Sequence, residues 1–99
     1  MLKKLTEIEV TKKVKEVPNW TYQNKAIHAN FKFNNFKDTF FVMKQIAFIA
    51  EKVNHHPSWS NVYNVLNISL TTHDVGGLTD KDFELAAMID VVVKDALMV

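Results

Sequence analysis

The chain has 99 residues, which suits a single domain, and its formal net charge of +1 creates no strong field for nucleic acid or a membrane surface. It has no cysteine, which excludes disulfides, thiolate metal sites and a cysteine nucleophile. The stretch MLKKLTEIEVTKK is too charged for a signal peptide, and no apolar run approaches the roughly 20 residues of a membrane span. We therefore expect one domain over residues 1–99, located in the cytoplasm.

The first predicted element is a helix over residues 6–16. Thr6 and Glu9 have the spacing of a capping box, in which each side chain binds the backbone amide of the other residue. Pro18 ends the helical pattern. The apolar stripe consists of Leu5, Val10, Val14 and Val17.

A β-hairpin is predicted next. In AIHANFKF, residues 26–33, apolar and polar side chains alternate, which is typical of a strand with one buried face. WTYQN, residues 20–24, is the expected partner strand, with a turn near Asn24 and Lys25. His28 falls on the polar face, and we interpret it as a surface residue.

A long helix is predicted over residues 36–54. Its apolar side chains form two neighbouring rows, an arc wide enough for a helix that lies across a sheet. The first row is Phe36, Phe40, Met43, Ala47 and Ala50, and the second is Val42, Ile46, Ile49 and Val53. Pro57 disfavours helical geometry at the residue before it, so the helix should end near Asn54 or His55.

A second hairpin is predicted within WSNVYNVLNISLTTH, residues 59–73, and the DVGG that follows should form a loop. The second strand directs Leu66, Ile68 and Leu70 to the core. A last helix is predicted over residues 79–96, with Thr79 as N-cap and Asp82 at the capping-box position. The order α-β-β-α-β-β-α indicates an α+β fold, with a four-stranded antiparallel sheet and the helices packed on one face.

The last predicted helix is more apolar than one buried face requires. One stripe holds Leu85, Met88, Ile89, Val92 and Ala96, while Val91, Val93, Leu97 and Met98 lie off it. In so small a chain this surplus is better buried against another subunit than exposed, so we expect a homodimer or homotetramer.

Three of the four histidines lie at the ends of predicted elements. His55 and His56 follow the long helix, and His73 ends a strand. If that helix lies across the sheet, the bend before Pro57 can turn both neighbouring histidines into one cleft at the end of the strand. Imidazole, with an ordinary pKa of about 6.5, both donates and accepts protons near neutral pH. The pattern therefore predicts a proton-transfer centre.

Plainer interpretations exist for each of these residues. His-His before a proline can be a polar helix end, Trp59 can serve packing, and Asp82 can act only as a cap. Three histidines can bind zinc, although the usual helical ligand spacing is absent. DVGG lacks the glycine and lysine patterns of nucleotide-binding loops.

Three segments carry a resemblance to a known family: FKDTFFVM (36–43), EKVNHHPSWSNVYN (51–64) and LTTHDVGGLTDKDFELA (70–86). Over about residues 5–95 the chain resembles the pterin-4a-carbinolamine dehydratases, a family with a member that acts as dimerisation cofactor of a transcription factor. The resemblance implies the α+β fold, dimers that join their sheets edge to edge, and further pairing through helices into tetramers.

The resemblance also implies a reaction, the loss of water from a 4a-hydroxytetrahydropterin to give quinonoid dihydropterin. An acid must protonate the departing hydroxyl at C4a, and a base must accept the N5 proton, so neither a metal nor an organic cofactor is needed. By the family pattern His55 and His73 are candidate general acids, while His56 holds the pterin and shares proton transfer. Such an enzyme recycles the pterin cofactor of an aromatic amino acid hydroxylase.

The same resemblance implies further site residues. Pterin contacts are expected at Pro57, Thr72, Asp74 and Val75, partly through backbone groups, with Glu51 and Trp59 lining the cleft and Asp82 near His73. Two positions depart from the family pattern. Asn54 stands where many members carry aspartate, and Lys81 replaces a frequent arginine, so the rate could differ.

Two other functions stay open at this stage. The chain could be a non-catalytic binding module that stabilises another protein's dimer, because a fold by itself does not fix a function. It could also have a pterin-related role in molybdenum cofactor metabolism. No direct nucleic-acid or membrane partner is expected.

Overall fold

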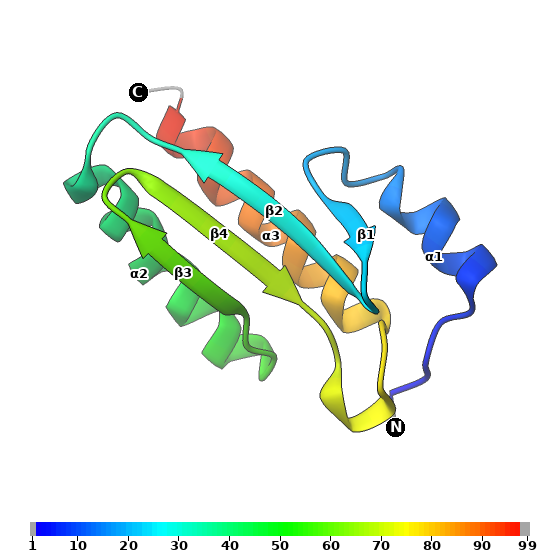
Figure 1. Ribbon diagram of the computed structural model, residues 1–99. Coiled ribbons are helices and arrows are strands. Elements are labelled where there is room, and N and C mark those ends of the chain that lie inside the picture. The colour runs from blue at the N-terminus through cyan, green and yellow to red at the C-terminus, as the bar shows by residue number, and fades with distance from the viewer. Residues whose placement is uncertain (1, 98–99) are drawn as a thin grey trace.

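The computed structural model describes residues 2–97 and contains the elements in the predicted order (Figure 1). The first half consists of α1 (Glu7–Val14), β1 (Thr21–Gln23) and β2 (Ala26–Lys32). The second half consists of α2 (Phe36–Val53), β3 (Ser58–Val62), β4 (Val65–Leu70), the 3₁₀ turn η1 (His73–Val75) and α3 (Asp80–Leu97). The predicted α+β architecture is confirmed.

The four strands form one antiparallel sheet in the order β1-β2-β4-β3. Each hairpin contributes one central strand, and β2 pairs with β4 from Ile27↔Leu70 to Lys32↔Val65. Because alternate residues of a strand share a face, the apolar positions of both central strands are buried together. Helices α2 and α3 cover that face, and α1 lies beside β1 at the edge of the sheet (Figure 1).

Two tight turns set the register of the hairpins. Asn24 and Lys25 both have positive φ, at 54° and 62°, as a two-residue hairpin turn requires, so the predicted turn is confirmed. In the second hairpin the Asn61 side chain donates hydrogen bonds to the carbonyls of Tyr63 and Val65, at 3.0 and 2.9 Å. The Asn64 side chain donates to the carbonyl of Phe33 at 2.8 Å, which ties this turn to the end of β2.

The capping box predicted for α1 is present. The Thr6 hydroxyl accepts from the amide of Glu9 at 3.2 Å, and the Glu9 carboxylate accepts from the amide of Thr6 at 2.9 Å. These hydrogen bonds lower the pKa of Glu9 below its usual value. The helix ends at Val14, because the amides of Glu16 and Val17 turn back to carbonyls only three residues earlier.

The two apolar rows of α2 differ in their surroundings. In the row nearer the sheet, Val42 and Ile46 are fully buried. In the other row, Phe36 and Phe40 are 49% and 56% exposed, and only Ala50 is buried. The helix lies on the sheet as predicted, but one sheet face covers only a stripe of the apolar arc, so Phe36 and Phe40 stay exposed.

The buried stripe of α3 is displaced from the predicted one. Val93 is buried although it was placed off the stripe, and Met88 is 41% exposed although it was placed on it. The buried row instead runs through Asp82, Ala86, Ile89 and Val93. Val91 and Leu97 are exposed as expected, while Met98 lies outside the described residues. Within residues 2–97, no helix has both the length and the hydrophobicity to cross a membrane.

Candidate active site

The C-terminal end of α2 sets the direction of the His-His pair. Asn54 adopts the left-handed conformation, with φ 55° and ψ 46°. Its amide donates to the carbonyl of Glu51 at 3.3 Å, and the amide of His55 donates to the carbonyl of Ala50 at 3.0 Å. This pair of bonds is a Schellman motif. The bend therefore occurs at Asn54, earlier than Pro57 would impose, and the available signal was an asparagine suited to left-handed backbone.

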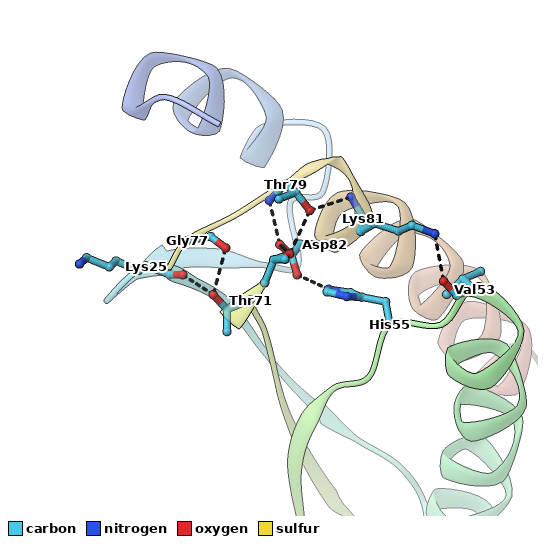
Figure 2. Close-up of polar contacts among 9 residues, drawn as sticks. Lys25, Val53, His55, Thr71, Gly77, Thr79, Lys81 and Asp82 are labelled. Carbon is cyan, nitrogen blue, oxygen red and sulfur yellow. Dashed lines mark hydrogen bonds and ion pairs between the residues drawn. The ribbon is translucent and has the colours of Figure 1, made fainter. Parts of the chain in front are cut away.

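His55 is directed inward by this bend and meets the first turn of α3. Its Nε2 lies 2.5 Å from Oδ1 of Asp82 (Figure 2). The His55 side chain is only 10% exposed and that of Asp82 is fully buried. Because the carboxylate fixes one ring nitrogen, the orientation of the imidazole is determined by the fold.

The Asp82 carboxylate also joins two other segments. Its Oδ2 accepts from the Thr72 hydroxyl at 2.8 Å and from the Thr79 amide at 2.9 Å. The hydroxyls of Thr72 and Thr79 lie 2.9 Å apart, and both side chains are buried. Thr79 was predicted only as a helix cap, and its bond to Asp82 confirms the capping-box spacing. The Asp82 carboxylate therefore belongs both to the N-terminal cap of α3 and to the candidate site.

His56 lies in very different surroundings from its neighbour. Its side chain is 55% exposed, and Nε2 is hydrogen bonded to the carboxylate of Glu51, one turn back on α2. Glu51 itself is largely exposed. Glu51 thus orients His56 at the protein surface, while the cleft-lining position expected for Glu51 stays a prediction.

The segment that carries His73 is fixed at its base. The Thr72 amide donates to the carbonyl of Gly77 at 2.9 Å. The Thr71 hydroxyl donates to the carbonyl of Lys25 at 2.8 Å (Figure 2). His73 and Asp74 are exposed on the short turn between these points. We expected Asp82 near His73, but its hydrogen bonds run to His55, and Thr72 is the link to His73.

Three further predicted site residues lie in the segments that carry or follow the histidines. Val75, which ends η1, and Pro57, between His56 and β3, are half-buried. Trp59 is half-buried in β3, where it pairs with Ile68 and packs against the core. Part of its ring therefore serves packing, and the rest is accessible.

His28, the fourth histidine, is separate from this network. It points to the sheet face opposite the helices, because its neighbours Ile27 and Ala29 are buried beneath them. Its Nδ1 lies 2.7 Å from the Ser69 hydroxyl, and Nε2 lies 2.9 Å from the carbonyl oxygen of Gln23. Among residues 2–97, no three His, Asp or Glu side chains are arranged to hold a metal ion.

Comparison with known sequences gives a consistent result. A family model described as pterin 4 alpha carbinolamine dehydratase matches residues 3–92. A protein from Christiangramia forsetii, named "Putative pterin-4-alpha-carbinolamine dehydratase", is 52% identical over 94 residues, which are 95% of this chain and 97% of that one. A protein of the same name from Solibacter usitatus is 49% identical over 90 residues, or 91% and 95% of the two chains.

Solved structures share the fold. A transcriptional coactivator/pterin dehydratase from Brucella melitensis superimposes with a TM-score of 0.90 at 34% identity, covering 92% of this chain and 99% of that one. A pterin dehydratase-like protein, identified as a RuBisCO assembly factor in the alpha-carboxysome, gives a TM-score of 0.62 at 19% identity, covering 75% and 86%. The second likeness shows a common fold alone.

Proposed function

The chain belongs to the pterin-4a-carbinolamine dehydratase family, and we propose that it catalyses the dehydration of a 4a-hydroxytetrahydropterin to quinonoid dihydropterin. The observation that carries this proposal is the buried Asp82 carboxylate. It holds His55 through one oxygen and, through the other, holds Thr72, the residue before His73. Two histidine-bearing segments are thereby anchored to one group.

His55 is the proposed general acid of best-defined geometry. We propose that Nε2 of His55 donates to Asp82, because a carboxylate that acts only as an acceptor needs a donor on this ring nitrogen. Nδ1 is then the nitrogen free to exchange a proton with the substrate. A neighbouring carboxylate also stabilises the imidazolium form that donates to a leaving group. One acid positioned in this way contributes a factor of roughly 10²–10⁴ to a rate.

His73 and His56 complete the proposed centre from the solvent side. In the reaction the C4a–O bond breaks, and the hydroxyl takes a proton from the acid and leaves as water. The N5–H bond gives its proton to a base, and the double bond forms between N5 and C4a. We assign His73, with His55, to the departing hydroxyl, and His56, oriented by Glu51, to holding the pterin and sharing proton transfer. No metal or organic cofactor enters these steps.

The residues beside the three histidines have a proposed binding role. The accessible part of Trp59 and the half-buried Pro57 offer flat apolar surface to a planar ring. The turn η1, which contains Asp74 and Val75 and follows Thr72, is proposed to contact the polar edge of a pterin, in part through the backbone of Asp74. We propose that the product returns to an aromatic amino acid hydroxylase as recycled cofactor.

The experiment that tests the function is a stopped-flow measurement of 4a-hydroxytetrahydropterin dehydration. We expect His55→Ala and His73→Ala each to lower the rate at least about tenfold while the fold persists by circular dichroism. His28→Ala is the matched control, since it removes an imidazole from the opposite sheet face and should retain the wild-type rate. A wild-type rate within a few-fold of the uncatalysed one would reject the dehydratase.

A homo-oligomer is also proposed, from the exposed apolar surface of α2 and α3. The exposed side chains are Phe36, Phe40, Phe41, Phe48, Met88, Val91 and Leu97. So large an apolar surface on a small domain is typical of an interface. We propose a homodimer or homotetramer, and light scattering of wild type and Phe48→Glu tests it, since the variant should reduce the assembled mass.

A second candidate function is supported by the same exposed phenylalanines. They would equally suit an apolar helix of another protein, so the chain could act as a binding module that stabilises a partner's dimer. The Brucella relative is described as both coactivator and dehydratase. Failure of the stopped-flow assay together with retained partner binding would favour this module.

A further inference from the structure

Lys81 makes a contact that the proposed chemistry does not use. Its Nζ lies 2.9 Å from the backbone carbonyl oxygen of Val53 (Figure 2). Lys81 is half-buried in the first turn of α3, and Val53 is the last residue of α2. The contact therefore joins the start of one helix to the end of another.

The carbonyl that Lys81 reaches is one that the helix cannot pair by itself. The last four carbonyls of a helix lack partners within the helix. The Schellman bonds use the carbonyls of Ala50 and Glu51, and Lys81 supplies a donor for that of Val53. A cation at this position also interacts favourably with the negative end of the helix dipole.

The Val53–Lys81 contact lies next to the His55–Asp82 contact in both segments. His55 follows Val53 by two residues, and Asp82 follows Lys81 directly. The two contacts therefore form adjacent cross-links between the same pair of segments. The Lys81 cross-link adds to the Schellman bonds in limiting how far the His55 segment can pivot about the Asp82 carboxylate.

We propose that Lys81 is a positioning residue, which holds the C-terminal end of α2 so that His55 presents its free ring nitrogen at the angle the reaction requires. The inference rests on the proposed dehydratase function for its catalytic consequence, but its structural part stands separately. Because an arginine at this position also carries donors at the end of a long chain, it should serve the same purpose.

The experiment compares Lys81→Met, which keeps the approximate length and removes the donor, with Lys81→Arg, which keeps a donor. Lys52→Met is the matched control, since Lys52 is an exposed lysine in the last turn of α2. The first readout is hydrogen exchange of the Asn54 and His55 amides, together with the NMR signal of the His55 Nε2 proton. The second readout is kcat and KM for dehydration.

We expect Lys81→Met to speed exchange of the two amides and to lower kcat by roughly tenfold to a hundredfold with little change in KM. Lys81→Arg and Lys52→Met should keep wild-type exchange and a kcat within about threefold of wild type. Should Lys81→Met fail to fold, Lys81→Gln, which is shorter and still polar, takes its place with the same expectation.

The two proposals fail in different ways. An inactive wild type would reject the dehydratase function, while the exchange readout would still decide whether Lys81 fixes the end of α2. Wild-type exchange and kcat in Lys81→Met would overturn the positioning role. It would equally be overturned if Lys81→Arg were no better than Lys81→Met.

Discussion

Two carboxylates of α3, Asp82 and Asp90, lie two helical turns apart. They differ in how deeply they are buried and in the hydrogen bonds they accept. Asp82 is fully buried and accepts hydrogen bonds from His55, Thr72 and the Thr79 amide. Asp90 is half-buried and accepts one from the indole N–H of Trp20 at 2.9 Å.

The electrostatics of the two carboxylates differ accordingly. Partial burial raises the pKa of Asp90 above its ordinary value, because its hydrogen bonds only partly offset the lost hydration. Asp82 has lost all contact with solvent but has donors on both oxygens. A fully buried carboxylate is therefore better explained as a built part of a site, and the half-buried one as a structural contact.

The largest expected effect that tests this comparison is that of Asp82→Asn. The amide nitrogen places a donor against groups that already donate, so we expect the dehydration rate to fall by about 10²–10³-fold. The free energy of unfolding should fall by about 1–3 kcal/mol, measured by urea titration. Asp90→Asn is the control, with a rate within about twofold of wild type. Full activity in Asp82→Asn would remove Asp82 from the site.

Thr72→Val should have the next largest effect. The change keeps the shape of the side chain but removes a donor from a buried carboxylate oxygen, which should cost about 1–3 kcal/mol of unfolding free energy. We also expect a several-fold slower dehydration. Thr72→Ser keeps the hydroxyl and should retain a rate within about threefold of wild type. Equal rates in the two variants would argue against the hydroxyl.

Glu51→Gln extends the comparison of buried and exposed carboxylates to the exposed Glu51, which is paired with His56. The Glu51–His56 pair is open to solvent, so its loss should change the free energy of unfolding by less than about 0.5 kcal/mol. The rate should fall only about threefold to tenfold, since His56 keeps its position but loses its orienting charge. A loss of rate as large as that of Asp82→Asn would show that the exposed Glu51–His56 pair is as important for the rate as the buried Asp82.

Asp90→Asn should have the smallest effect, and one that depends on pH. The pKa of Asp90 is raised in the folded state, so its contribution to stability is fully present below the unfolded value and is lost as pH rises through the folded value. At pH 7 the asparagine variant, uncharged and still able to accept from Trp20, should therefore be slightly more stable than wild type. Thermal unfolding at pH 7 and pH 3 checks this, and the advantage should disappear at the lower pH.

The fold could be predicted from the sequence because local patterns agree with it. Alternation located the two central strands, and the Asn24–Lys25 turn fits the short loop between β1 and β2. What a single helix pattern cannot show is how much of an apolar arc its neighbours cover. For that reason the exposure of Phe36 and Phe40 was not predicted, and the stripe of α3 was displaced at Met88 and Val93.

The site was predictable only in part. The positions of His55, His56 and His73 at element ends follow from local rules, whereas the partner of His55 depends on tertiary packing. Asp82 follows His55 by 27 residues, and although a carboxylate at this place could be expected to orient a histidine, the sequence did not show that this histidine is His55. The helix end near Asn54 was predicted, but the bend was attributed to Pro57 and not to the left-handed backbone of Asn54.

The three-way junction at Asp82 has a consequence for how the protein matures during synthesis. Its partners come from the end of α2, the end of β4 and the start of α3, and Asp82 is held in place by the docking of Ala86, Ile89 and Val93 farther along that helix. A growing polypeptide therefore cannot complete this arrangement until α3 has been synthesised as far as Val93. The contacts of Asp82 with His55 and Thr72 form late, when α3 packs on the sheet.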